Sequence, residues 1–81
     1  MNEVLIEYIH GQLLNGRADV AVGPDDDLLA SGLVDSIGML QIIQFVEKRF
    51  SISIPFEDVT IENFGTVGNM SSYLDNRGVA P

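Results

Sequence analysis

Cysteine and tryptophan are absent from this sequence, and basic residues are scarce, with four Lys and Arg against twelve Asp and Glu. Without cysteine the chain can form neither a disulfide nor a thiolate metal site, and it suits a reducing compartment. The formal net charge of −8 opposes binding to nucleic acid or to an anionic membrane. We therefore expect protein partners that carry basic surfaces.

No apolar run comes near the roughly 20 residues that a helix needs to cross a bilayer. The N-terminus lacks the basic region of a signal peptide. We therefore expect a cytoplasmic protein, and the start of the chain at Met1, so close to the first expected helix, indicates a protein that stands alone. A length of 81 residues predicts one domain over 1–81, with a frayed tail over 76–81.

Helical periodicity is clear in three segments of the chain. Apolar residues recur every three or four positions after Asn2, from Ile37 to Phe50, and after Thr66. Thr60 predicts the N-cap of one short helix, while residues 17–35 show no period and contain proline and glycine. We predict an all-α fold, a small four-helix bundle of three longer helices and one short helix, with a long first loop.

The stretch before the central helix places a serine where that helix begins. Asp35 and Ser36 are both candidate N-caps, because either side-chain oxygen can accept a hydrogen bond from the first turn. Ser36 then lies in the partial positive field of the helix N-terminus, which favours a phosphate group. The pattern therefore suits a hydroxyl that carries a phosphodiester.

Asp35-Ser36-Ile37, the apolar helix that ends at Phe50 and the following Ile54-Pro55 together resemble the motif of acyl carrier and peptidyl carrier proteins. The resemblance implies 4′-phosphopantetheine, attached to Ser36 by a phosphopantetheinyl transferase that uses coenzyme A. It implies that Asp35 helps to position the magnesium-bound substrate of the transferase. The thiol of the attached arm then carries an acyl or aminoacyl group as a thioester, and the protein is a carrier without catalytic activity.

The resemblance leaves two alternatives for the cargo. Glu47 is the only acidic residue of the helix after Asp35, fewer than in carriers of fatty acid synthesis, and the segment from Asp58 to Phe64 is similar to that of discrete carriers beside adenylating ligases. These features favour a monomer that is loaded with an aminoacyl or short acyl group by such a ligase, in a nonribosomal peptide-like or hybrid pathway. Condensing or tailoring enzymes would follow, and fatty acyl or polyketide cargo is the alternative.

The expected partner surface lies beside Ser36. Ile37 and Leu40 either widen the core face of the helix or form an exposed docking patch, and the resemblance favours the patch. Gly38 either leaves room for a partner or the prosthetic arm, or is simply tolerated near the helix end. The residues expected on this partner surface are Ile37, Gly38, Leu40, Gln41, Gln44, Lys48 and Ile61.

Other functions find less support in the sequence. A hydrolase that uses Ser36 needs a base, and nothing places His10, the only histidine, near it. A metal site around His10 would have to use Glu3 and Glu7. The acidic run over 25–27 lacks the alternating ligands of a calcium loop. A helical adaptor that binds partners without any modification of Ser36 is the remaining alternative.

Overall fold

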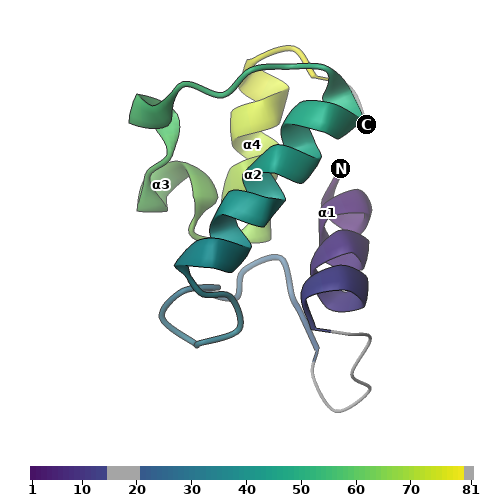
Figure 1. The fold of residues 1–81 in the computed structure, drawn as a ribbon, viewed down its shortest axis with the longest axis vertical. Helices are drawn as coiled ribbons and strands as arrows, with labels where there is room; N and C mark the ends of the chain where they lie inside the picture. The colour runs from purple at the N-terminus through teal and green to yellow at the C-terminus, as the bar shows by residue number, and fades with distance from the viewer. Residues whose placement is uncertain (15–20, 80–81) are drawn as a thin grey trace.

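This computed structural model describes residues 1–14 and 21–79, which form four α-helices and two short helical turns joined by loops (Figure 1). In chain order they are α1 (Asn2–Tyr8), a π-helical turn (Ile9–Leu13), α2 (Ser36–Phe50), a 3-10 turn (Phe56–Asp58), α3 (Ile61–Phe64) and α4 (Val67–Asn76). Over the described residues there is no strand, and the predicted bundle of three longer helices and one short helix is confirmed. Residues 17–20 of the expected first loop lie outside the described residues.

Side-chain caps define where the later helices begin. The Asp35 carboxylate caps α2, the Thr60 hydroxyl caps α3 and the Thr66 hydroxyl caps α4, each by accepting a backbone N–H of the first turn. At its other end α2 stops at Ser51, whose φ of 55° is left-handed. Of the two candidate N-caps for α2, the structure therefore selects Asp35 and leaves Ser36 as the first helical residue.

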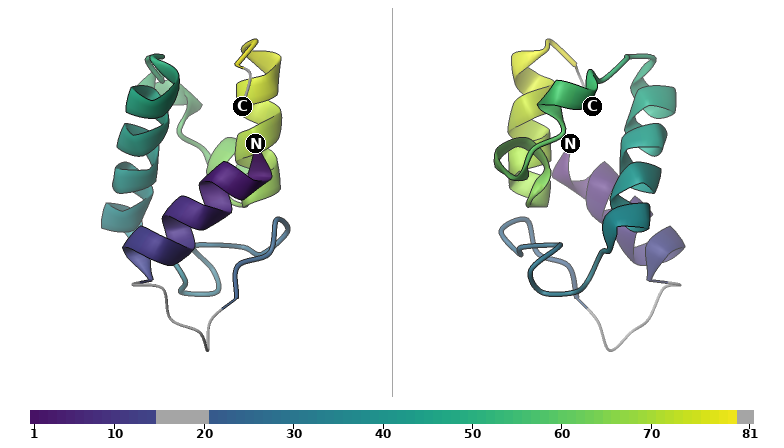
Figure 2. Two further views of the ribbon diagram at one scale, coloured as in Figure 1. Left: turned by 90° about the vertical axis from the view of Figure 1, so that its right-hand side faces the viewer. Right: turned by 60° about the vertical axis from the view of Figure 1, so that its left-hand side comes forward.

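Helix α1 runs obliquely across the space between α2 and α4 (Figure 2). Near its start, Ser71 of α4 donates a hydrogen bond to Asn2. Further along, the rings of Tyr8 and Phe45 stack with centroids 4.1 Å apart, which ties α1 to α2. The first helix therefore bridges the central helix and the last one.

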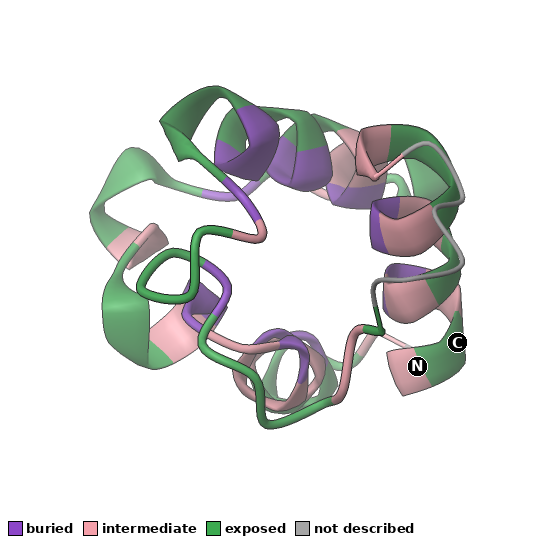
Figure 3. Ribbon diagram, turned by 90° about the horizontal axis from the view of Figure 1, so that it is seen from below, coloured by how far each residue is buried: buried purple, intermediate pink, exposed green. Residues whose placement is uncertain are grey.

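The buried faces of the helices turn toward a common interior (Figure 3). Each fully buried large apolar side chain contributes about 1.5–3 kcal/mol through its removal from water. Helix α2 supplies the apolar stripe that its periodicity predicts, with Met39, Ile42, Ile43 and Val46 buried. The other buried hydrophobic residues are Leu5, Ile9, Leu28, Val34, Ile54, Phe64, Val67, Met70 and Leu74.

The described part of the first loop, residues 21–35, is fastened to the link between α3 and α4 and to its own turns. Leu28 is fully buried, and its N–H donates to the Gly65 carbonyl at 3.0 Å. Two carboxylates of the acidic run cap turns within the loop: Asp26 accepts from the N–H of Gly23 and Asp27 from that of Ala30. The loop therefore leads the chain into Ser36 along a fixed path.

Hydrogen bonds also hold the segments that follow α2 and α4. A side-chain oxygen of Glu47 accepts the N–H of buried Ile54 at 2.8 Å, which anchors the loop after α2. The N–H of Val79 donates to the Leu74 carbonyl at 3.0 Å. These bonds close the end of α4 up to Val79, residues 80–81 lie outside the described residues, and the expected fraying over 76–81 stays a prediction. None of the helices in the described ranges is long and apolar enough to cross a membrane.

Candidate functional site

Ser36 is exposed at the first position of the 15-residue helix α2. The preceding Asp35 is extended, and its Oδ1 accepts the N–H of Gly38 at 2.7 Å, which fixes the first turn. The Asp35 carboxylate occupies the N–H of Gly38, and no acidic side chain lies within the turn itself, so the other free N–H groups of the turn remain available to an anion. This arrangement presents a hydroxyl to solvent in a field that favours a phosphate.

A recess of about 310 Å³ opens beside Ser36. Its lining comes from the end of the first helical segment, the approach to α2 and the first turns of α2, namely Leu13, Gly32, Leu33, Val34, Asp35, Ile37, Gly38 and Gln41. Gly32 has a φ of 79°, a left-handed conformation that favours glycine, and Val34 is buried. The residues on both sides of the serine therefore leave open space beside it.

Gly38 serves internal packing. It is buried, and a Cβ at this position would lie 2.9 Å from Cγ1 of Val34 and 3.2 Å from Oδ1 of Asp35. The missing side chain is thus required by the chain's own approach to α2. Gly38 also lines the recess beside Ser36, and its place on the expected partner surface stays a prediction.

The other six residues of the expected partner surface are exposed. Ile37 is 68% exposed, Leu40 57% and Ile61 69%. Gln41, Gln44 and Lys48 are also exposed. Ile37 and Leu40 therefore do not widen the core face. Ile61 lies on helix α3, which packs against α4 (Figure 2).

Two exposed apolar side chains were not identified from the sequence. Phe56 is 88% exposed and Leu29 is 40% exposed. Leu29 lies at the rim of a small recess of about 110 Å³, which it lines with Met39, Val59, Thr60, Ile61 and Phe64. The one local signal for Phe56 is its position directly after Pro55 and before two carboxylates, a composition typical of an exposed turn.

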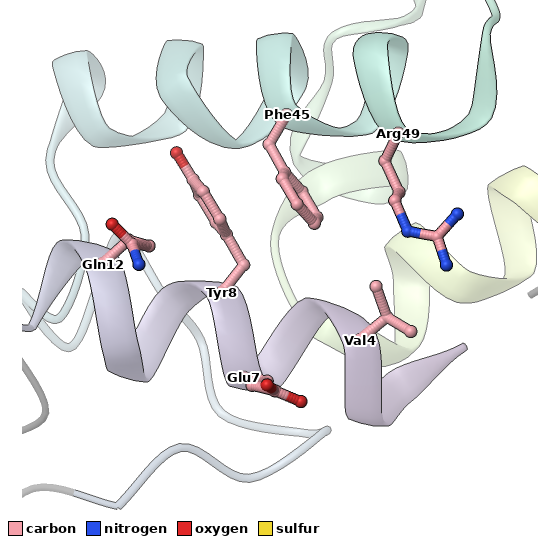
Figure 4. Close-up of a pocket in the computed structure, with 6 residues that line it drawn as sticks. All are labelled: Val4, Glu7, Tyr8, Gln12, Phe45 and Arg49. Atoms are coloured by element: carbon pink, nitrogen blue, oxygen red, sulfur yellow. The ribbon is translucent and has the colours of Figure 1, made fainter.

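A larger groove of about 360 Å³ runs between α1 and α2 (Figure 4). Tyr8 and Phe45 form its aromatic middle, and the Tyr8 hydroxyl donates to the Gln41 carbonyl at 3.4 Å. Glu7 and Arg49 add one charge of each sign. The groove shares no lining residue with the recess beside Ser36, so the two are separate.

The arrangement of the site supports neither a hydrolase that uses His10 as its base nor a metal site around His10. His10 is not among the residues that line the recess beside Ser36. Within residues 1–14 and 21–79, no group of three or more His, Asp and Glu side chains is placed to hold a metal ion. The site therefore offers an exposed serine hydroxyl in the positive field of a helix N-terminus.

A small helical bundle that displays a serine at the capped start of its central helix defines a carrier of covalently bound groups. The chain matches the protein family described as "Phosphopantetheine attachment site" over residues 5–74, and it belongs to that family. Its prosthetic group is accordingly 4′-phosphopantetheine, held covalently.

Several curated relatives are D-alanyl carrier proteins. The protein from Streptococcus suis (strain 98HAH33) is 35% identical over 54 residues, which are 67% of this chain and 68% of that protein. The protein from Bacillus velezensis is 29% identical over 55 residues, 68% of this chain and 70% of that protein. A chain in a solved structure, "Crystal structure of FAD-dependent dehydrogenase", superposes with a TM-score of 0.76 at 25% identity, over 88% of this chain and 99% of that chain.

Proposed function

We propose that this protein is a free-standing, single-domain carrier that holds an aminoacyl or short acyl group as a thioester on 4′-phosphopantetheine attached to Ser36. The observation that carries the proposal is the exposure of Ser36 at the capped N-terminus of α2, beside an open recess. The bound arm supplies the thiol, which the chain itself lacks because it has no cysteine.

The chain's own residues prepare the serine for modification. The Ser36 hydroxyl oxygen forms the new ester bond to the pantetheine phosphate of coenzyme A, the hydroxyl proton is lost, and adenosine bisphosphate leaves. Asp35 holds the first turn through the N–H of Gly38, which fixes the backbone of Ser36 at the positive end of the helix dipole. Asp35 also lies next to the serine, where its carboxylate can help to position the magnesium-bound substrate of the transferase.

We infer that the group carried as a thioester is small. The relatives are D-alanyl carrier proteins, whose name specifies an aminoacyl group. The apolar recess at Leu29 and Ile61 has about 110 Å³, whereas an engineered apolar cavity that binds one benzene molecule has about 150 Å³. A long acyl chain would therefore find no shelter there, and an aminoacyl or short acyl group needs none.

The partners follow from this role. A phosphopantetheinyl transferase adds the arm, an adenylating ligase loads it, and condensing or tailoring enzymes receive the cargo from a monomeric carrier. The exposed side chains of Ile37, Leu40 and Ile61, with the polar Gln41, Gln44 and Lys48, offer these enzymes a small apolar contact that can be released after each step.

Loading tests the proposal directly. The modified protein is incubated with ATP, D-alanine and a D-alanine-adenylating ligase, and its intact mass is measured before and after treatment with hydroxylamine, which cleaves thioesters. We expect one aminoacyl group per modified chain, released by hydroxylamine, and none on the Ser36→Ala variant. Stable attachment of the amino acid to unmodified protein would contradict the carrier role.

A further inference from the structure

The recess beside Ser36 begins at the serine itself. Asp35 and Ile37, the two neighbours of Ser36 in the chain, both line it. Its volume of about 310 Å³ lies at the lower end of the range for small-molecule pockets, which is about 300–1,000 Å³. A group attached to the Ser36 hydroxyl therefore starts at the rim of a space that can hold part of a small molecule.

Leu13 lines this recess from the side of the first helical segment. It is half-buried, and a Cβ at Gly38 would lie 3.7 Å from its Cδ1, so its side chain reaches the first turn of α2. Leu13 ends the π-helical turn, in which the N–H of Leu14 donates to the Ile9 carbonyl at 3.0 Å. Turns of this type occur frequently at functional sites. The turn thus gives the recess a wall that comes from outside α2 and its approach.

The first helix is held against α2 just before this turn. The rings of Tyr8 and Phe45 stack with an angle of 16° between their planes, and the Tyr8 hydroxyl donates to the Gln41 carbonyl at 3.4 Å. Gln41 itself lines the recess. These contacts fix the end of the first helical segment against α2, so the wall that Leu13 forms is in place before any group is attached.

The lining suits the chemistry of the part of the arm that is nearest to the phosphate. That part carries two methyl groups on one carbon, followed by a hydroxyl and the first of two amides. Leu13, Val34 and Ile37 offer apolar side chains to the methyl groups. The exposed side-chain amide of Gln41 can both donate to and accept from an amide of the arm. The residues present therefore fit the prosthetic group.

The apolar recess at Leu29 and Ile61 offers the arm a poorer fit. It has about 110 Å³ and shares no lining residue with the recess beside Ser36. Neither neighbour of Ser36 in the chain lines it. Volume and adjacency to the serine therefore both favour the recess that Leu13 lines.

We propose that the phosphate-proximal half of the phosphopantetheine arm rests in the recess lined by Leu13 and Gln41, and that Leu13 is the positioning residue for the resting arm. The proposal rests on the proposed attachment of the arm to Ser36. Because a short tether gives an effective concentration of millimolar order, weak contacts are enough to hold the arm. The thiol half stays outside the recess, where the ligase can load it, and partner enzymes draw the arm from this one starting position.

Isotope-filtered NMR tests where the arm rests. The full chain is labelled with heavy isotopes of carbon and nitrogen and is modified with unlabelled coenzyme A, which selects NOEs between protons of the arm and protons of the protein. We expect NOEs from the paired methyl groups of the arm to the methyl groups of Leu13 and Ile37. Modification should also shift the amide signals of Gly32 and Gln41, which lie outside the immediate neighbours of Ser36 in the chain.

Two results of this measurement would overturn the proposal. Shift changes confined to residues 35–37, without NOEs to Leu13, would mean that the arm extends into solvent. NOEs from the paired methyl groups to Leu29 or Ile61 would place the arm in the smaller recess instead.

Leu13→Ala tests the positioning role against a matched control, Leu14→Ala. Both leucines are half-buried and pack against the core, and of the two Leu13 alone lines the recess. We expect Leu13→Ala to lose the NOEs at Ile37 and the shift change at Gln41, and Leu14→Ala to retain both. A merely structural role of Leu13 would lower the melting temperature and leave these signals unchanged, which would overturn its assignment as the positioning residue.

Gln41→Ala keeps the test decisive if Leu13→Ala does not fold. Gln41 is exposed, and its backbone carbonyl still accepts from Tyr8 in the variant, so the fold should persist. Gln44→Ala is the control, because Gln44 is an exposed glutamine of α2 that does not line the recess. We expect the shift change at Gly32 to be lost in Gln41→Ala and retained in Gln44→Ala. An equal shift change in both variants would overturn the proposal.

The outcomes separate this proposal from the proposed function. Intact mass shows first whether Ser36 carries the arm. If no phosphopantetheine is attached to the wild-type chain, the proposed function fails and the resting position fails with it. If the arm is attached and gives no NOEs to Leu13, the resting position is wrong while the carrier role stands.

Discussion

Gly11 and Gly38 both lie in helical segments, yet their surroundings differ. A Cβ at Gly11 would meet nothing within 4 Å, whereas one at Gly38 would lie 2.9 Å from Val34. We expect Gly11→Ala to raise the free energy of unfolding by about 0.5–1 kcal/mol. Gly38→Ala should lower it by about 1–3 kcal/mol, since the stiff valine must move.

Urea denaturation of the two variants measures this difference. Stabilisation by Gly38→Ala would contradict the account of its burial, because it would mean that Val34 and Asp35 yield at no cost.

Leu40 and Ile42 lie two residues apart on α2 and face different surroundings. Leu40 is 57% exposed and Ile42 is fully buried. Leu40→Glu should therefore change stability by less than about 0.5 kcal/mol and weaken loading by the ligase, because it places a charge in an apolar contact. Ile42→Ala should cost about 2–5 kcal/mol through the cavity it leaves.

A melt and a loading rate on the same variants test this assignment. A large stability loss in Leu40→Glu, with normal loading of its folded fraction, would mean that Leu40 belongs to the core.

At the scale of elements, local chemistry in the sequence predicts where the helices begin. Thr60 and Thr66 are N-caps as expected, and α2 carries its buried stripe at helical spacing, because capping and periodicity depend on near neighbours along the chain. The role of Gly38 and the bracing of Asp58 by Tyr73 could not be predicted, because they depend on side chains brought together by packing.

The bond between α4 and the segment before α3 predicts a dependence of stability on pH. Burial raises the pKa of Tyr73 above its usual value of 10.0, and the hydrogen bond that it donates to Asp58 adds to this rise. A raised pKa in the folded state means that the contribution to stability is complete below pH 10 and is lost as pH rises through the folded value. We therefore expect wild type to lose stability above pH 10 more steeply than Tyr73→Phe.

Chemical denaturation of both proteins at a series of pH values from neutral to alkaline checks this expectation. Parallel curves would show that the hydroxyl of Tyr73 has the same proton affinity in the folded and unfolded chains.

At the scale of the whole molecule, the net charge of −8 on 81 residues favours expansion of the chain. Among the residues that the structure describes, the one salt bridge joins the N-terminal ammonium and Glu3 at 3.6 Å, and it is solvated. Salt should therefore stabilise the fold by screening repulsion, with the melting temperature rising between low and moderate ionic strength. A melting temperature that falls over the same range would contradict this view of the surface.

The attachment of the arm to Ser36 is the central claim, and the measurement that tests it most directly is intact mass with peptide mapping. The purified chain and its Ser36→Ala variant are incubated with coenzyme A and a phosphopantetheinyl transferase, and circular dichroism confirms that both are folded. We predict one phosphopantetheine per wild-type chain, located on the peptide that contains Ser36, and none on the variant. A phosphopantetheine on folded Ser36→Ala, or on any other peptide of the wild type, would contradict the account.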